Sequence, residues 1–239
     1  MKLTVLAVIL AVAGLLAVQA DDFTPAQRDA IVAIMRDALK RDPSILRDAV
    51  ASMQADDATR EAAANKTAIA KYRGEILASP AGMVAGNPKG TVTVVEFYDT
   101  RCPYCRKMLP EIAALLQSDP NVRWIYKDFP VLGASSTMEA KALLAADRQG
   151  GYAKMQALLM KQGGTETTDN IAMLASGAGL DARKLLADMQ DPAIADAINA
   201  NLALGTNLNI NGTPAFVIGD TKVPGAVDLD DLRKLVAGG

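Results

Sequence analysis

Histidine is absent from the 239-residue chain, and cysteine and the aromatic residues are scarce. Without an imidazole the chain cannot build a Ser-His-Asp or Cys-His nucleophile, and it cannot hold zinc or copper through histidine. It also has no GxGxxG or Walker-type phosphate-binding loop. The formal net charge is only -2, so the composition does not indicate nucleic acid as a partner. The chemistry that remains available is that of thiols, carboxylates, lysines and hydroxyls.

The first twenty residues have the pattern of a secretory signal peptide. Lys2 is followed by an apolar stretch from residue 3 to 18 and by a small-x-small sequence that ends at Ala20. A membrane anchor is the alternative, but the stretch is about as short as a spanning helix can be, and acidic residues follow it. We therefore expect cleavage near Asp21 and a mature chain in the bacterial periplasm, where disulfides persist.

Residues 21–80 are predicted to form a helical arm and a linker. A Thr-Pro pair at 24–25 is typical of a helix start, and an Asp-Pro pair at 42–43 predicts a break between two amphipathic helices. Their apolar stripes need a partner, which is either the downstream domain or the same segment of another chain. We favour self-association through residues 23–55, as a dimer or a trimer. Residues 55–78 are polar and alanine-rich, which is typical of a solvent-exposed connector.

A domain of mixed strands and helices is predicted for residues 81–239, so the fold class is α/β. Loop-forming residues at the start of this range mark the expected domain boundary. The expected elements are a strand at 91–98, a helix from Pro103, a strand at 121–130, a helical block at 135–208, a strand and hairpin at 213–227 and a closing helix.

The chain has two cysteines, Cys102 and Cys105, which directly follow the first predicted strand and have two residues between them. A disulfide that closes so short a loop contributes only about 2 kcal/mol in the chain-entropy model, which makes a structural staple a poor interpretation. A closed zinc site needs four ligands, and this chain has one cysteine pair. Two thiolates can hold a soft ion such as Cu(I), and this metal-binding role for Cys102 and Cys105 stays open.

The surrounding residues favour a redox-active dithiol. Cys102 is expected at the N-terminus of a helix, where the helix dipole and free N–H groups stabilise a thiolate. Cys105 follows one turn later and is placed to resolve a mixed disulfide. Glu96 lies on the preceding apolar strand, where a carboxylate is costly to bury without a partner. It is either a partly exposed edge residue or a proton acceptor for Cys105, with Lys127 as its expected charge partner.

The sequence resembles the DsbA-like branch of the thioredoxin superfamily over residues 81–239, through the motifs EFYDTRCPYC and NGTPAFVIG. This resemblance implies a thioredoxin fold with an inserted helical domain and a cis-proline at Pro214 that faces the cysteines. It also implies that the backbone of Thr213 pairs with substrate and that Glu96 is the family's buried acid. With its N-terminal arm, the chain is most similar to the suppressor-of-copper-sensitivity C (ScsC) proteins, which are periplasmic and linked to copper tolerance.

We therefore expect a periplasmic protein disulfide isomerase or reductase that acts on misfolded or reduced secreted proteins. Thr213 before the cis-proline is similar to isomerases of the DsbC and DsbG type, whereas CPYC differs from the CPHC of strongly oxidising DsbA proteins. Cys102 would attack the substrate disulfide, a membrane reductase would keep the dithiol reduced, and no cofactor is required. The alternatives are a monomeric DsbA-like oxidase and a Cu(I)-binding copper-tolerance protein.

Overall fold

The computed structural model describes residues 23–162 and 167–238. The expected signal peptide, residues 1–20, lies outside the described residues. Within the described parts of the chain, no helix is both long and apolar enough to cross a membrane. The chain divides into two compact units, with the division between Ala58 and Thr59.

The first unit contains α1 (Pro25–Arg41) and the N-terminal part of α2 (Ser44–Lys71). The predicted helix start is confirmed, because Thr24 and Gln27 form a capping box that satisfies free backbone N–H groups at the start of α1. The predicted break is confirmed as well. Asp42 ends α1, and its side chain accepts a hydrogen bond from the first N–H group of α2 at 3.0 Å.

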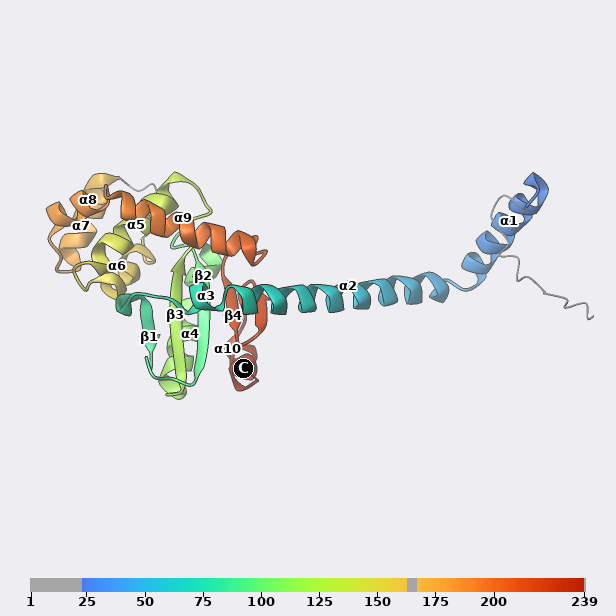
Figure 1. Cartoon of the computed structure of the whole chain (residues 1–239), viewed down its shortest axis with the longest axis horizontal. Coiled ribbons are helices and arrows are strands. Elements are labelled where there is room, and N and C mark those ends of the chain that lie inside the picture. Colours follow the sequence, from blue (N-terminus) through green and yellow to red (C-terminus); the bar gives the residue numbers. More distant parts are fainter. Residues whose placement is uncertain (1–22, 163–166, 239) are drawn as a thin grey trace, which may run out of the picture. The chain divides into compact units, whose positions relative to one another are not determined.

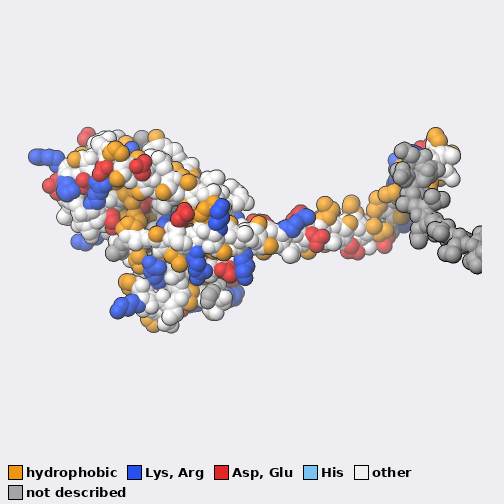
Figure 2. All heavy atoms as spheres, viewed as in Figure 1, with side chains coloured by type: hydrophobic (Ala, Val, Ile, Leu, Met, Phe, Trp, Pro, Cys, Tyr) orange, Lys and Arg blue, Asp and Glu red, His pale blue; other side chains and the backbone are white. Residues whose placement is uncertain are grey.

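Large apolar side chains of this unit lie on its surface. Within α1, all of whose residues are described, no side chain is buried, and Figure 2 shows exposed apolar side chains along the N-terminal part of α2. The exposed large apolar residues of the unit are Phe23, Ile31, Val32, Ile34, Met35, Leu39, Ile45, Leu46, Val50 and Met53. Apolar surface gathered in this way is typical of an interaction site.

The second unit is built around a mixed sheet with the strand order β1-β3-β2-β4-β5. The parallel strands β2 and β3 are joined by the crossover helix α4 (Pro103–Ser118), and the other neighbouring strands are antiparallel. The strands are β1 (Val84–Gly86), β2 (Val92–Tyr98), β3 (Val122–Asp128), β4 (Ala215–Ile218) and β5 (Thr221–Pro224). The predicted α/β class is confirmed. Strand β1 lies within the segment that the sequence predicts to be a loop. Its three residues are too few to show a strand pattern in the sequence, and they form a strand because they pair with β3.

Helices cover both faces of the sheet, and successive residues of β2 face opposite sides (Figure 1). Val94 belongs to the apolar cluster formed with α4 and α10 (Leu229–Ala237) on one face. Val95 belongs to the cluster on the other face, which includes residues near the ends of α2 and α9 (Pro192–Asn207). Because the pattern alternates, Glu96 lies on the face that α4 covers.

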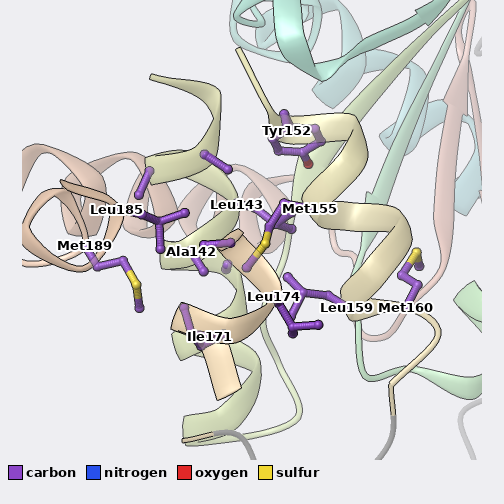
Figure 3. Packing of buried hydrophobic residues seen from close by; sticks show 14 of the residues in the cluster. Ala142, Leu143, Tyr152, Met155, Leu159, Met160, Ile171, Leu174, Leu185 and Met189 are labelled. Carbon is purple, nitrogen blue, oxygen red and sulfur yellow. The ribbon is translucent and has the colours of Figure 1, made fainter. Parts of the chain in front are cut away.

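The helical insertion between β3 and β4 has an apolar core of its own. Its described helices are α5 (Ala134–Asp147), α6 (Tyr152–Leu159), α7 (Thr168–Gly177), α8 (Ala182–Asp188) and α9. Figure 3 shows Leu143, Met155 and Leu185 from three of these helices converging in this core. Cys102 and Cys105 belong to the same cluster of buried residues. The insertion therefore packs directly behind the cysteine motif.

Residues 55–67 are largely exposed, as their composition predicts, but residues 68–77 pack on the sheet, which differs from the predicted connector over 55–78. Ile69 near the end of α2 and Ile76 in α3 (Arg73–Leu77) are each only 2% exposed and lie in the apolar cluster beneath β2. Together with the partly buried Ala68, Tyr72 and Leu77, these two side chains anchor an otherwise polar segment on the sheet. The compact unit thus begins at Thr59, earlier than predicted.

We expect Ile76→Ala to lower the free energy of unfolding of the second unit by about 2–5 kcal/mol, because it leaves a cavity in a closed apolar cluster. Urea denaturation measures this change. Met173→Ala, at a side chain that is 59% exposed on α7, is the control and should change little. Equal stability of the two variants would contradict the packing of residues 68–77 on the sheet.

Candidate active site

Cys102 lies at the point where β2 ends and α4 begins. It is the N-cap residue of α4, with an extended backbone, and Pro103 occupies the first turn of the helix. The N–H group of Cys102 donates a hydrogen bond to the backbone oxygen of Asp99 at 3.0 Å. Both cysteines are free thiols; Cys102 is 4% exposed and Cys105 is completely buried. The more accessible sulfur thus lies at the helix start, and the second sulfur lies behind it.

The segment before β4 brings the cis-proline to the cysteines. The peptide bond between Thr213 and Pro214 is cis, and the thiol of Cys102 donates a hydrogen bond to the backbone oxygen of Thr213 at 3.2 Å. The pairing of β4 with β2 explains this approach across 111 residues, because Ala215 lies opposite Phe97 in the sheet. The structure therefore brings Cys102, Thr213 and Pro214 together, as the resemblance implies.

Glu96 is buried within the central strand β2. Its side chain is 1% exposed, and its Oε2 accepts a hydrogen bond from the indole N–H of Trp124 at 3.1 Å. Burial raises the pKa of Glu96 to about 8, although the hydrogen bond from Trp124 opposes this shift. With this pKa, the carboxyl group can hold or release a proton near neutral pH. The interpretation of Glu96 as a partly exposed edge residue is wrong, because β2 has neighbouring strands on both sides.

Lys127 is not the partner of Glu96, so this expectation is wrong. In the sheet Glu96 lies opposite Tyr126, and Lys127 lies opposite Phe97. Since neighbouring residues of a strand face opposite sides, the two charged groups lie on different faces. The amine of Lys127 instead donates hydrogen bonds to the backbone oxygens of Glu75, at 2.9 Å, and Ala78. Burial lowers the pKa of Lys127.

Cys105 lies close enough to Glu96 for the two groups to influence each other. Burial raises the pKa of the Cys105 thiol, and the charge of Glu96 raises it further. A thiol in this environment stays protonated until a base accepts its proton. Glu96 carries a carboxyl group on the face of the sheet that α4 covers, so the arrangement can couple proton movement at Cys105 to that carboxyl group.

Three further polar groups near the site have no motif of their own in the sequence. Arg101, which precedes Cys102, pairs with the buried Glu139 of α5 at 2.8 Å. Asp99 is 2% exposed and accepts three backbone hydrogen bonds. Asp128 accepts a hydrogen bond from the hydroxyl of Tyr152, and burial raises the pKa of Asp128 to about 7. The signal that singled out Glu96, a carboxylate on or beside an apolar strand, also applies to both aspartates.

A groove of ≈ 360 Å³ runs beside the cis-proline. It is lined by residues 209–215, by Pro224, and by the side chains of Glu61 and Lys222. The amine of Lys222 donates a hydrogen bond to the backbone oxygen of Asn209 at 3.0 Å, which ties the segment before the cis-proline to β5. The groove provides space for a polypeptide segment next to Thr213.

The two cysteines are also the residues to which the Cu(I) hypothesis refers. Among residues 23–162 and 167–238, no group of three or more Cys, Asp or Glu side chains is arranged to hold a metal ion. A Cu(I) ion bound here would therefore rely on the sulfurs of Cys102 and Cys105, the soft ligands that this ion prefers.

Residues 78–237 match the family model described as "Thioredoxin". The chain belongs to the thioredoxin family. Among solved structures, this thioredoxin-family chain is 39% identical to a thioredoxin-like oxidoreductase from Silicibacter pomeroyi, with a TM-score of 0.62 over 67% of this chain and 97% of that one. It is 28% identical to a linker-deletion mutant of Proteus mirabilis ScsC, with a TM-score of 0.67 over 90% and 96% of the two chains.

A third solved structure is the thiol-disulfide exchange protein alpha-DsbA2 from Wolbachia pipientis. It is 28% identical to this thioredoxin-family chain, with a TM-score of 0.68 over 75% of this chain and 97% of that one. The resemblance to DsbA-like and ScsC proteins is therefore confirmed, and these neighbours support a thiol-disulfide oxidoreductase activity.

The curated relatives that the chain matches are longer proteins. One is a Na⁺/H⁺ antiporter, NhaA 1, of Salinispora arenicola, which is 26% identical over 155 residues. These residues are 64% of this thioredoxin-family chain and 24% of the antiporter. The chain thus spans about a quarter of the length of the curated relatives it matches.

We expect Glu96→Gln to change how stability depends on pH. The pKa of Glu96 is near 4.5 in the unfolded chain and about 8 in the folded chain. Below pH 4.5 both states hold the proton. Between pH 4.5 and 8 the unfolded state loses it and the folded state keeps it, so the natural chain loses stability as pH rises. Glutamine removes this loss, which is on the order of 3–5 kcal/mol.

Urea denaturation of the reduced proteins between pH 4.5 and 9 tests this expectation. The stability difference between Glu96→Gln and the natural chain should widen through this range in favour of the variant, and then level off. Glu111→Gln, at a partly exposed carboxylate on α4, is the control and should run parallel to the natural chain. A constant difference for Glu96→Gln would mean that Glu96 is already ionised in the folded protein.

Proposed function

We propose that this chain is a periplasmic thiol-disulfide oxidoreductase that acts as a protein disulfide isomerase and reductase on secreted proteins. One observation carries the proposal: the thiol of Cys102, at the start of α4, contacts the backbone oxygen of Thr213 beside the cis-proline, while Cys105 lies buried behind it. The leader-like first twenty residues favour the periplasm.

The reaction begins when the Cys102 thiolate attacks a disulfide sulfur in the substrate. A bond forms between Cys102 and that sulfur, the substrate S–S bond breaks, and the other substrate sulfur leaves as a thiolate. In isomerisation, a substrate thiolate then attacks the substrate sulfur bound to Cys102, which forms a new substrate disulfide and returns Cys102 as a thiolate. No electrons are gained or lost overall.

In reduction, Cys105 attacks the sulfur of Cys102 instead. The substrate leaves with both sulfurs reduced, having gained two electrons, and the pair becomes a Cys102–Cys105 disulfide. The proton of Cys105 must leave before the attack, and Glu96 is the base that we assign to accept it. A membrane reductase with its own dithiol would return the two electrons. Thr213 and Pro214 would hold the substrate chain next to Cys102, along the neighbouring groove.

The exposed apolar residues of the first unit favour isomerisation over oxidation. We propose that residues 23–55 join two or three copies of the chain, so that several catalytic domains engage one misfolded protein. A monomeric DsbA-like oxidase would leave this surface without a role. The Cu(I)-binding alternative uses the same two sulfurs and predicts that alkylation of the reduced protein abolishes Cu(I) binding.

We expect Cys102→Ser to abolish thiol-disulfide exchange, because serine has no thiolate to attack a disulfide. Cys105→Ser should still attack substrate but should accumulate a mixed disulfide, because nothing within the site resolves it. Refolding of a scrambled-disulfide test protein and non-reducing electrophoresis measure the two effects. Full activity of Cys102→Ser would contradict the proposed mechanism.

We expect the double substitution Ile34→Asp and Leu46→Asp to separate the copies and to suppress isomerisation. These side chains are 68% and 59% exposed, so the charges disturb association rather than the helices themselves. Sedimentation gives the mass, and the scrambled test protein gives the activity. Met173→Asp, at a side chain 59% exposed on α7, is the control and should change neither.

Two results would contradict this proposal about the arm. The first is a natural chain that sediments as a monomer. The second is a natural chain that rapidly oxidises a reduced substrate but does not reshuffle a scrambled one, which would identify an oxidase.

A further inference from the structure

The carboxylate of Asp99 lies between two backbone turns beside the active site. Its Oδ1 accepts a hydrogen bond from the N–H group of Arg101 at 2.9 Å. Its Oδ2 accepts from the N–H groups of Val131, at 2.9 Å, and Leu132, at 3.1 Å. The residue is 2% exposed. A carboxylate is costly to bury, and three backbone N–H groups are what offsets this cost here.

The first of these turns leads into Cys102. Arg101 directly precedes the cysteine, and the N–H group of Cys102 bonds to the backbone oxygen of Asp99 itself. The side chain of Arg106 on α4 donates to the backbone oxygen of Thr100 at 2.9 Å, which fixes the same turn from the other side. The turn at the start of α4 is therefore fixed by three contacts: the bond of the Asp99 side chain to Arg101, the bond of Cys102 to the Asp99 backbone, and the bond of Arg106 to Thr100.

The second turn follows β3 and carries exposed apolar side chains. Phe129 is anchored, because its N–H group donates to the backbone oxygen of Tyr98 at 2.8 Å. Val131 and Leu132 are 43% and 52% exposed, so their apolar parts face solvent. Tyr104, between the two cysteines, is 62% exposed. Because the two turns bond to the two oxygens of one carboxylate, Val131 and Leu132 are held next to the turn that carries Cys102.

We propose that Asp99 is a positioning residue that holds the Val131–Leu132 turn beside Cys102, so that both contact one substrate chain. The occupant is an unfolded polypeptide segment with apolar residues near its cysteine. Such a segment is what a thiol-disulfide exchange site receives, since its sulfur must reach Cys102. This inference rests on the proposed function. It assigns Asp99 to substrate affinity rather than to the reactivity of the sulfur.

The substitution Asp99→Asn separates these two contributions. An asparagine offers one acceptor oxygen, whereas the carboxylate offers two, and its NH₂ group cannot accept a hydrogen bond. The amide oxygen can keep either the one bond to Arg101 or the two bonds to Val131 and Leu132, and amide hydrogen exchange at Val131 and Leu132 shows which turn is released. In the first orientation, which asparagine favours in this type of turn, the N–H groups of Val131 and Leu132 face an NH₂ group. The cysteine turn is kept, and the second turn is released.

The experiment uses the full mature chain in reduced form and follows the attack of Cys102 on two disulfides. One is an unfolded test protein whose single cysteine is joined to thionitrobenzoate through a disulfide. The other is the small-molecule disulfide formed by two thionitrobenzoates. In each case a new bond to Cys102 forms, a disulfide bond breaks, and thionitrobenzoate leaves as a coloured thiolate. The reaction does not require isomerase activity, so failure of that part of the proposed function is seen separately, in the refolding assay.

For Asp99→Asn we expect the half-saturating concentration of the unfolded protein to rise about tenfold, while the saturated rate and the small-molecule rate change less than about twofold. Amide hydrogen exchange at Val131 and Leu132 should accelerate about tenfold or more. Asp119→Asn is the matched control, because Asp119 accepts a similar bond from the N–H group of Asn121 far from the cysteines in sequence. It should leave all of these quantities unchanged.

Leu132→Ser keeps Asp99 and provides a second test if Asp99→Asn folds poorly. It should raise the same half-saturating concentration without accelerating exchange at Val131. The proposal is overturned if neither variant weakens saturation by the unfolded protein. It is also overturned if Asp99→Asn slows both disulfides by the same factor, which would place its effect on the sulfur, or if the natural chain releases no thionitrobenzoate.

Discussion

The antiparallel pairing of β4 with β2 is the constraint on which the site depends. It places Ala215 opposite Phe97 and so brings the Thr213 backbone to the thiol of Cys102. The insertion α5–α9 leaves the sheet after β3 and returns at β4, so its described helices can pack behind the cysteines without interrupting this pairing. The register of two short strands thus determines where a substrate sulfur could meet the dithiol.

Three buried charged side chains on or directly after strands β2 and β3 bond to uncharged partners. Glu96 bonds to the indole of Trp124, Lys127 bonds to backbone oxygens, and Asp99 bonds to backbone N–H groups. An ion pair between Glu96 and Lys127 would have fixed the carboxyl group in its ionised form. A neutral hydrogen-bond donor instead leaves burial to dominate, so this carboxyl group remains able to exchange a proton near neutral pH.

Local signals made much of this structure predictable from the sequence. The cap at Thr24, the break at Asp42 and the strand-to-helix junction at Cys102 each depend on neighbouring residues, and each is present. The cis-proline is predictable only through the resemblance to a known family, because the spacing of residues alone does not show that Pro214 lies near Cys102. The features that were missed depend on distant contacts: β1 exists through its pairing with β3, and Ile76 is buried only because a sheet lies beneath it.

The burial of Glu96 and Asp128 has a consequence for a chain that contains no imidazole. In most proteins histidine supplies the proton exchange that occurs around neutral pH. Here two carboxyl groups have been moved into that range by the apolar interior, to about 8 and about 7. A histidine carries charge when it is protonated, whereas these groups become neutral. A fall in pH through this range therefore removes negative charge from the interior of the sheet domain, and this pH dependence comes from packing rather than from residue type.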